Sequence, residues 1–216
     1  MKSTESTYLT ALYFRRELLF YRDAYQNKSI GMFDFFMKLK SHLIALNNFK
    51  DYIDGVGLYI KDNETILSNR KKVTQHLECC KYLRHKICGH LDDVLCEMAK
   101  KWEPTALLKS PLSEHPEYER MWRVDMYTKA LIESGINSFR KDKPSQLFFS
   151  DEIDIIYPPN RKQFMDFIGF TNETCIQILS DIADHLEPNI TFYDGLTDAL
   201  EAIKEAAEMD FGVKNK

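Results

Sequence analysis

The stretch Val73–Met98, VTQHLECCKYLRHKICGHLDDVLCEM, decides the fold that the rest of the chain has to match. Its apolar positions follow the alternating spacing of four and three residues that is typical of a helix packed on other helices. The seam consists of Val73, Leu77, Cys80, Arg84, Ile87, Leu91, Val94 and Met98. Arg84 stands where an apolar residue is expected, and His90 borders the same stripe. We therefore predict a long central third helix, residues 64–102, with charge on its packing face.

The composition also favours helices. The 216 residues include only 8 Gly and 7 Pro, against 14 Phe and 11 Tyr. Few helix breakers and many large side chains are typical of long helices that pack on each other. The length suits one domain, so we expect a single all-α bundle of about five to seven helices over residues 1–216.

Apolar residues at helical spacing predict the other helices. Ser3 or Thr4 is the expected N-cap of the first helix. We expect Gly135 to bend or end the fourth helix early, and Gly169 to interrupt the fifth. The predicted ranges are 7–25, 32–53, 117–139, 164–186 and 194–209.

Residues 103–163 are less regular than the rest, so we interpret them as an insertion, a lid or a partner surface around the fourth helix. The segments 147–149 and 153–157 are short extended candidates. Pro158 and Pro159 follow directly and are expected to close the second of them.

The chain carries none of the signs of a secreted or membrane protein. No run approaches the ~18 apolar residues of a membrane span, and the first residues do not open a signal peptide. Four of the five cysteines crowd one helical segment, where they cannot easily bridge one another, so a reducing compartment fits. We expect a cytoplasmic protein without membrane contact. Because the net charge is −4, binding of RNA or DNA would need a local basic patch.

Soft metal ligands in the third helix raise zinc as an alternative chemistry. These ligands are His76, Cys79, Cys80, Cys88, His90 and Cys96. They form no CxxC pair, and structural zinc usually gathers ligand pairs from separate turns or strands. We therefore expect no metal and no cofactor.

The segment Tyr82–Asp93 concentrates the chemistry of the chain. Arg84 is followed by the polar His85, and five residues separate Arg84 from His90. This pattern resembles the signature of the HEPN superfamily, the helical domains of many prokaryotic toxin, abortive-infection and CRISPR-associated ribonucleases. Their motif is an arginine, a polar residue and, after a short interval, a histidine.

The resemblance implies an HEPN-like bundle that acts as a metal-independent endoribonuclease or an RNA-binding component of a toxin–antitoxin or defence system. It implies a homodimer in which two motifs face one cleft, with an antitoxin or defence protein as partner. Arg84 would hold the scissile phosphate, His90 would transfer a proton, and His85 would orient a group or contact the phosphate. To these we add Asp93, one helical turn after His90, as the group that fixes the imidazole tautomer.

A second interpretation gives the same residues a structural role. Arg84 and His90 then form an interhelical polar network in which Arg84 pairs with a core carboxylate, because a buried charge needs a partner. His85 is then a solvated surface residue, and the chain is a catalytically silent dimerisation or protein-interaction module. The surroundings of Arg84 distinguish the two interpretations.

Overall fold

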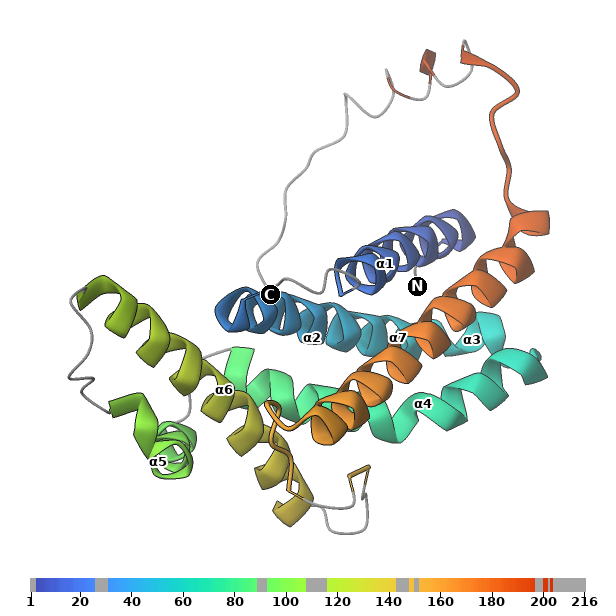
Figure 1. Cartoon of the computed structure of the whole chain (residues 1–216). Helices are drawn as coiled ribbons and strands as arrows, with labels where there is room; N and C mark the ends of the chain where they lie inside the picture. The colour runs from blue at the N-terminus through green and yellow to red at the C-terminus, as the bar shows by residue number, and fades with distance from the viewer. Residues whose placement is uncertain are drawn as a thin grey trace.

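The computed structural model describes residues 3–25, 31–88, 93–107, 116–142, 148–149, 152–196, 200–201 and 203. Over these residues the regular structure is helical, without a strand, which confirms the predicted all-α class (Figure 1). Seven α-helices occur in this part of the chain: α1 (Thr4–Ala24), α2 (Met32–Gly55), α3 (Gly57–Ile60), α4 (Glu64–Leu83), α5 (Asp93–Trp102), α6 (Pro116–Asp142) and α7 (Pro158–Leu186).

Side-chain caps begin two of the long helices where the sequence offers them. The Ser3 hydroxyl accepts a hydrogen bond from the Ser6 N–H at 3.1 Å, so Ser3 rather than Thr4 caps α1. The side-chain oxygen Oδ1 of Asn63 accepts from the Ile66 N–H at 3.1 Å and caps α4 in the same way. Each cap satisfies one of the N–H groups that a helix start leaves without an intrahelical partner.

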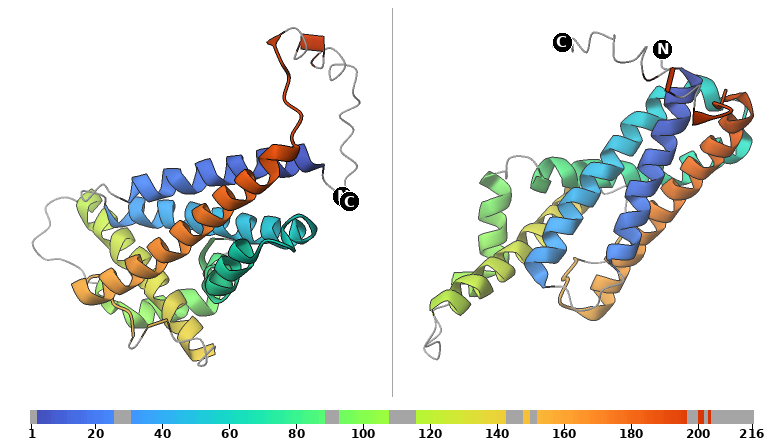
Figure 2. Two further views of the ribbon diagram at one scale, coloured as in Figure 1. Left: turned by 90° about the vertical axis from the view of Figure 1, so that its right-hand side faces the viewer. Right: turned by 90° about the horizontal axis from the view of Figure 1, so that it is seen from above.

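Four helices, α1, α2, α4 and α7, form the main bundle, in which α1 runs antiparallel to α2 and to α7 (Figures 1 and 2). Polar contacts fix the order of the helices at several levels. Arg15 of α1 donates to the Ser180 hydroxyl of α7 at 2.8 Å, and Tyr52 of α2 donates to the Thr7 carbonyl of α1 at 2.9 Å. Lys50 of α2 lies 3.3 Å from a Glu78 carboxylate oxygen of α4.

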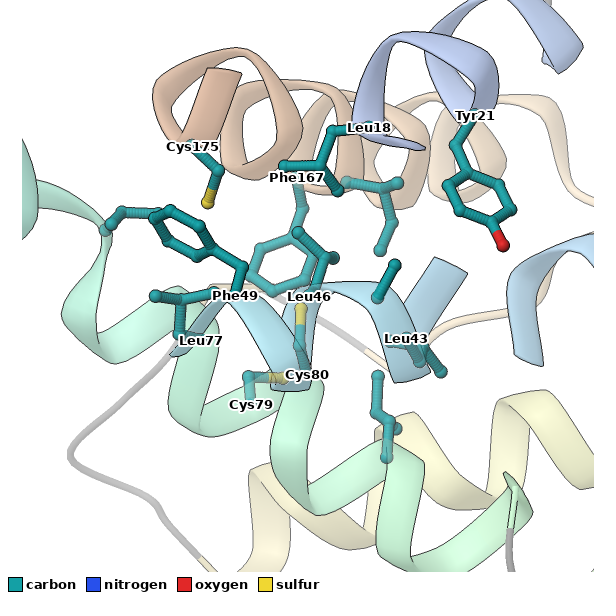
Figure 3. Packing of buried hydrophobic residues seen from close by; sticks show 14 of the residues in the cluster. Leu18, Tyr21, Leu43, Leu46, Phe49, Leu77, Cys79, Cys80, Phe167 and Cys175 are labelled. Atoms are coloured by element: carbon teal, nitrogen blue, oxygen red, sulfur yellow. The ribbon is translucent and has the colours of Figure 1, made fainter. Parts of the chain in front are cut away.

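The core lies where these four helices meet (Figure 3). Burying one such Leu or Phe side chain contributes about 1.5–3 kcal/mol relative to leaving it exposed. Buried members that Figure 3 labels are Leu18, Tyr21, Leu43, Leu46, Phe49, Leu77, Cys79, Cys80, Phe167 and Cys175. The five cysteines of the chain are all free, so packing and not cross-linking holds this core together.

Helix α6 packs on α2 and α4 at one end of the bundle, and α5 packs on α6 (Figure 2). Gly135 allows the close approach: a Cβ atom there would lie 3.4 Å from the Leu83 Cδ2 atom and 3.7 Å from the Ile87 Cγ2 atom. Helix α6 continues to Asp142, so the predicted early end of the helix at Gly135 is wrong. Gly135 serves packing instead.

The prediction of one long third helix over residues 64–102 is also wrong. Helix α4 ends at Leu83, a π-helical turn follows over Arg84–Cys88, and α5 takes a new direction (Figure 2). The predicted seam is buried at Val73, Leu77, Cys80 and Ile87, whereas α5 buries Leu95 and Ala99 instead of Val94 and Met98.

The structure of residues 153–157 differs from the predicted strand. Ile153 and Ile155 are buried as a strand pattern predicts, but no strand forms over 152–157. The segment ends before Pro158 and Pro159 as predicted, and the two prolines begin α7, where a missing N–H costs nothing. Helix α7 also continues through Gly169. Most of the predicted helix 194–209 lies outside the described residues.

No helix in the described part of the chain combines the length and the apolar character that crossing a membrane requires.

Candidate functional site

The π-helical turn Arg84–Cys88 is fixed from two sides by the fold. Ile87 is fully buried and faces α6 near Gly135. On the other side the Cys88 thiol donates to the Lys40 carbonyl oxygen of α2 at 3.5 Å. Turns of this kind occur frequently at functional sites, because they displace side chains from ordinary helical positions. The turn thus holds Arg84, His85 and Lys86 on a rigid support.

Arg84 is half-buried, and its surroundings lack the partner that a structural network requires. Within the described residues no carboxylate pairs with Arg84, and its hydrogen-bond partner there is the His85 ring, at 3.4 Å between Nη1 and Nδ1. A guanidinium only donates, so in this contact the His85 ring accepts through Nδ1. The exposed His85 side chain thus lies at the surface beside a cation.

Further positive charge lies around this turn. Lys86 belongs to the turn itself, and its Nζ atom lies 6.0 Å from the centre of the Tyr82 ring. Burial raises the pKa of the Cys88 thiol to about 11, while the positive charges of Lys40 and Arg84 act on it in the opposite direction. We call Lys40, Arg84, His85 and Lys86 the basic cluster. It supplies a local basic patch in a chain whose net charge is −4.

The fold brings together two of the four predicted site residues. Arg84 and His85 share the π turn. Asp93 is the first residue of α5 and is exposed, beyond the end of the turn. His90 lies between them in sequence and outside the described residues.

A hollow of about 250 Å³ lies beside the turn, between α4, α5 and α6. Lys86 and Lys141 contribute its cationic groups. Across it, the Tyr82 hydroxyl donates to Asp142 at 2.7 Å and so ties the end of α4 to the end of α6. The other lining residues are Val94, Leu95, Met98 and Ser138.

The zinc alternative finds no support in the described part of the chain, where no three His, Cys, Asp or Glu side chains gather as metal ligands do. His76 instead packs among aromatic rings, 4.5 Å from Phe148 and 4.8 Å from Phe170 between ring centres. Burial lowers the pKa of His76 and raises the pKa of Cys80 to about 12. Both groups behave as core residues.

Sequence reasoning missed a polar stripe on α6. Lys129, Glu133 and Asn137 follow one another at intervals of four residues, and that spacing was the available signal. Glu133 is fully buried and accepts from the Trp102 indole N–H at 2.7 Å and from the Ile155 N–H at 2.6 Å.

The same stripe holds the irregular region in place. The Lys129 Nζ atom lies 2.7 Å from a Glu103 carboxylate oxygen and 3.7 Å from a Glu133 carboxylate oxygen. The Asn137 amide exchanges two hydrogen bonds with the backbone of Ile153, at 2.8 and 3.2 Å. The backbone of the expected strand is thus paired with α6 side chains, which explains why it needs no partner strand.

The chain was compared with family models, with curated proteins and with solved structures, and none of the three comparisons finds a match. The residues of the site therefore carry the functional argument.

Proposed function

We propose that this chain is an HEPN-like, metal-independent endoribonuclease whose basic cluster binds the RNA phosphate. The observation that carries the proposal is the half-exposed Arg84, which has no carboxylate partner among the described residues and lies beside His85 on a π turn. A cation that no acidic group of the described residues neutralises is a candidate to bind an anion from outside the chain.

The chemistry follows from the groups at hand. Arg84 binds two non-bridging oxygens of a phosphodiester and offsets the charge that grows on them in the transition state. The ribose 2′-oxygen attacks phosphorus, the bond from phosphorus to the 5′-oxygen breaks, and a 2′,3′-cyclic phosphate forms. His90 accepts the proton of the 2′-hydroxyl or delivers one to the leaving 5′-oxygen. His85 donates its Nε2 hydrogen to the phosphate, and Asp93 orients the His90 ring.

We further propose a homodimer that places two basic clusters beside one cleft. A second copy would double the positive charge along the RNA strand, and counterion release would then make binding steeply dependent on salt. An antitoxin or defence protein is the expected partner, because a ribonuclease inside its own cell has to be restrained.

The test is a cleavage assay with purified protein, tRNA and total RNA in the presence of a metal chelator. Wild-type protein should cleave, and Arg84→Ala and His90→Ala should each lower the rate by about a hundredfold or more. Lys162→Ala is the matched control, because Lys162 is an exposed lysine of α7 paired with Asp166. Equal cleavage by all four proteins would contradict the proposal, since a contaminating nuclease would explain it.

Binding measurements separate the RNA-binding form of the proposal from a silent helical module. If wild-type protein retains RNA without cleaving it, Arg84→Ala should weaken binding and reduce the salt slope by about one. If wild-type protein neither cleaves nor binds several RNAs, the nuclease proposal is wrong and the chain is an interaction module.

A further inference from the structure

Helices α5 and α6 project together from the main bundle and form the walls of a second hollow (Figure 2). The hollow has a volume of about 430 Å³ and lies between α5, the 3₁₀-helical turn Pro104–Leu107 and α6. It shares no residue with the basic cluster or with the hollow beside the π turn. Sites for small molecules usually have volumes of about 300–1,000 Å³. The size of this hollow is therefore that of a ligand site.

Polar contacts with α6 hold the walls of the hollow in place. Helix α5 ends at Trp102, and the turn Pro104–Leu107 packs on α6. The Trp102 indole N–H donates to Glu133 at 2.7 Å, and the Lys129 Nζ atom lies 2.7 Å from a Glu103 carboxylate oxygen. The two α6 residues in these contacts are buried. A hollow that such contacts hold open is preformed, so a ligand that enters it has little of the chain to order.

The inner surface of the hollow is mainly apolar. Ala106 is buried there, whereas Leu107 and Val124 are 70% and 46% exposed. Tyr127 adds an aromatic ring, and its hydroxyl is hydrogen-bonded to the Cys96 thiol. Burial and this hydrogen bond raise the pKa of Tyr127 to about 12, so its hydroxyl is uncharged at neutral pH. The hollow thus offers apolar surface that a ligand could remove from water.

Among the charged groups at the hollow, the best-placed carboxylate is already occupied and the guanidinium is not. Both Glu103 carboxylate oxygens accept hydrogen bonds, one from Lys129 and the other from the Thr105 hydroxyl. Arg123 donates to Glu119 at 2.9 Å, and this is its hydrogen bond within the described residues. A guanidinium has several N–H groups, so Arg123 retains donors for a further acceptor. A ligand that accepts hydrogen bonds is therefore favoured over one that donates them.

Lys100 places a second cation on the opposite wall, since it belongs to α5 and Arg123 belongs to α6. Its Nζ atom lies 2.6 Å from a Glu97 carboxylate oxygen, and both side chains are exposed. An ion pair in water contributes little, so a ligand can replace one of its partners at low cost. A carboxylate is an acceptor only and forms its strongest hydrogen bonds with cations. It is the group that matches this pair of cations.

We propose that this hollow binds a small amphipathic carboxylate, an apolar chain or ring that carries one carboxylate group. The apolar body covers Leu107, Val124 and the Tyr127 ring, and its burial drives binding. The carboxylate accepts hydrogen bonds from Arg123, with Lys100 as the second cation. Binding here is independent of the proposed RNA site, because the two sites share no residue.

Titration with octanoate, followed by two-dimensional NMR of the backbone amides, tests the site. Octanoate should shift resonances of α5, of the turn and of the facing part of α6 saturably, with a Kd of about 1 mM or lower. Octanol has the same chain without the charge, and octylamine carries the opposite charge. Both should bind at least about tenfold more weakly than octanoate, because neither supplies an anionic acceptor.

Two variants separate the charge from the apolar surface. Arg123→Gln should weaken octanoate binding by about tenfold and leave octanol binding unchanged. Arg120→Gln is the matched control, because Arg120 is an exposed arginine of the same helix that pairs with Glu117 and lies outside the hollow. Val124→Trp should fill the hollow and abolish the binding of both compounds. Because Val124 is 46% exposed, this substitution leaves the core intact.

Equal affinities for octanoate and octanol would overturn the proposal, since the cations would then play no part. It would also be overturned if octanoate caused no saturable shift, or shifts only in other helices. An equal loss of octanoate binding in Arg123→Gln and Arg120→Gln would contradict it too, because affinity would then follow the overall charge of the chain. Weaker binding in Arg123→Gln and Val124→Trp, with Arg120→Gln like the wild type, is the expected result.

Discussion

The polar stripe of α6 and the π turn after α4 place charged groups on packing faces, yet they differ in how far those groups are satisfied. Glu133 is fully buried, with donors from Trp102 and Ile155 and the ammonium of Lys129 nearby. Arg84 is half-buried and has His85 as its hydrogen-bond partner among the described residues. A polar group that the chain satisfies itself belongs to the architecture, whereas one that the chain leaves open is a candidate for binding.

The largest effect is expected from Glu133→Leu. The substitution leaves the Trp102 and Ile155 N–H groups without acceptors and removes a charge partner of Lys129, so we expect a loss of about 3–5 kcal/mol in the free energy of unfolding. Urea denaturation followed by circular dichroism measures it. Glu133→Gln keeps one acceptor oxygen and should lose less. A loss below about 1 kcal/mol would show that the stripe does not anchor the irregular region.

Gly135→Leu tests the contact that joins the two regions. Side-chain atoms beyond Cβ would enter the space of Leu83 and Ile87, and overpacking of this kind costs about 1–3 kcal/mol. Gly135→Ala is the matched control, because its Cβ fits at 3.4 Å and alanine gains up to about 1 kcal/mol over glycine inside a helix. Thermal unfolding of both variants gives the comparison. Destabilisation by alanine as large as that by leucine would mean that α6 and the turn are packed more tightly than these distances state.

A feature of the fold or of the candidate site could be predicted from the sequence when the interaction that determines it is local. The Ser3 cap, the burial of Val73 and Leu77 and the start of α2 at Met32 follow from neighbouring residues, and they agree with the prediction. The π turn could not be predicted, because the seam continues through Arg84 and Ile87 without a break. Its cause is tertiary: contacts with α2 and α6 hold the turn.

In the irregular region, too, the sequence pattern predicts burial but not the tertiary partners of the backbone. The alternation of Ile153 and Ile155 is a correct signal of burial, but it cannot say what pairs with the backbone. The partners are Asn137 and Glu133, side chains of a helix about twenty residues away along the chain. Of the candidate site, the neighbourhood of Arg84 and His85 follows from their adjacency, whereas the absence of a carboxylate partner for Arg84 among the described residues required the structure.

A smaller effect is expected in the pH dependence of stability. Burial raises the pKa of Glu133 to about 7, although the Ile155 N–H, the Lys129 charge and the Trp102 N–H act to lower it. The folded state therefore binds more protons than the unfolded state between pH 4.5 and 7. This contribution to stability is complete below the unfolded value and is lost as the pH rises through 7, with a slope of at most about 1.4 kcal/mol per pH unit.

Glu133→Gln isolates that slope from other titrations. Burial lowers the pKa of His42 to about 4, so His42 contributes the opposite trend, with stability that rises from pH 4 to 6.5. Urea denaturation at several pH values gives the free energy of unfolding of both proteins. The amount by which the wild type exceeds the variant should shrink as the pH rises. A difference that does not change with pH would contradict the raised pKa of Glu133.

The smallest effect on stability is expected from Arg84→Ala. This substitution tests most directly whether the π turn differs from the polar stripe of α6. The turn is held by Ile87 and by the Cys88 hydrogen bond to Lys40, neither of which involves the guanidinium. We therefore expect a change within about 0.5 kcal/mol, as for substitutions away from buried networks, together with the loss of RNA cleavage proposed above. Arg84→Lys keeps the charge but not the planar fork, so it should match wild-type stability and still bind phosphate less well. A loss of about 3 kcal/mol or more in the free energy of unfolding of Arg84→Ala would be similar to that expected for Glu133→Leu. Arg84 would then belong to a satisfied network like that of α6. The π turn would then be architecture, and the interaction module would explain the chain better than the nuclease.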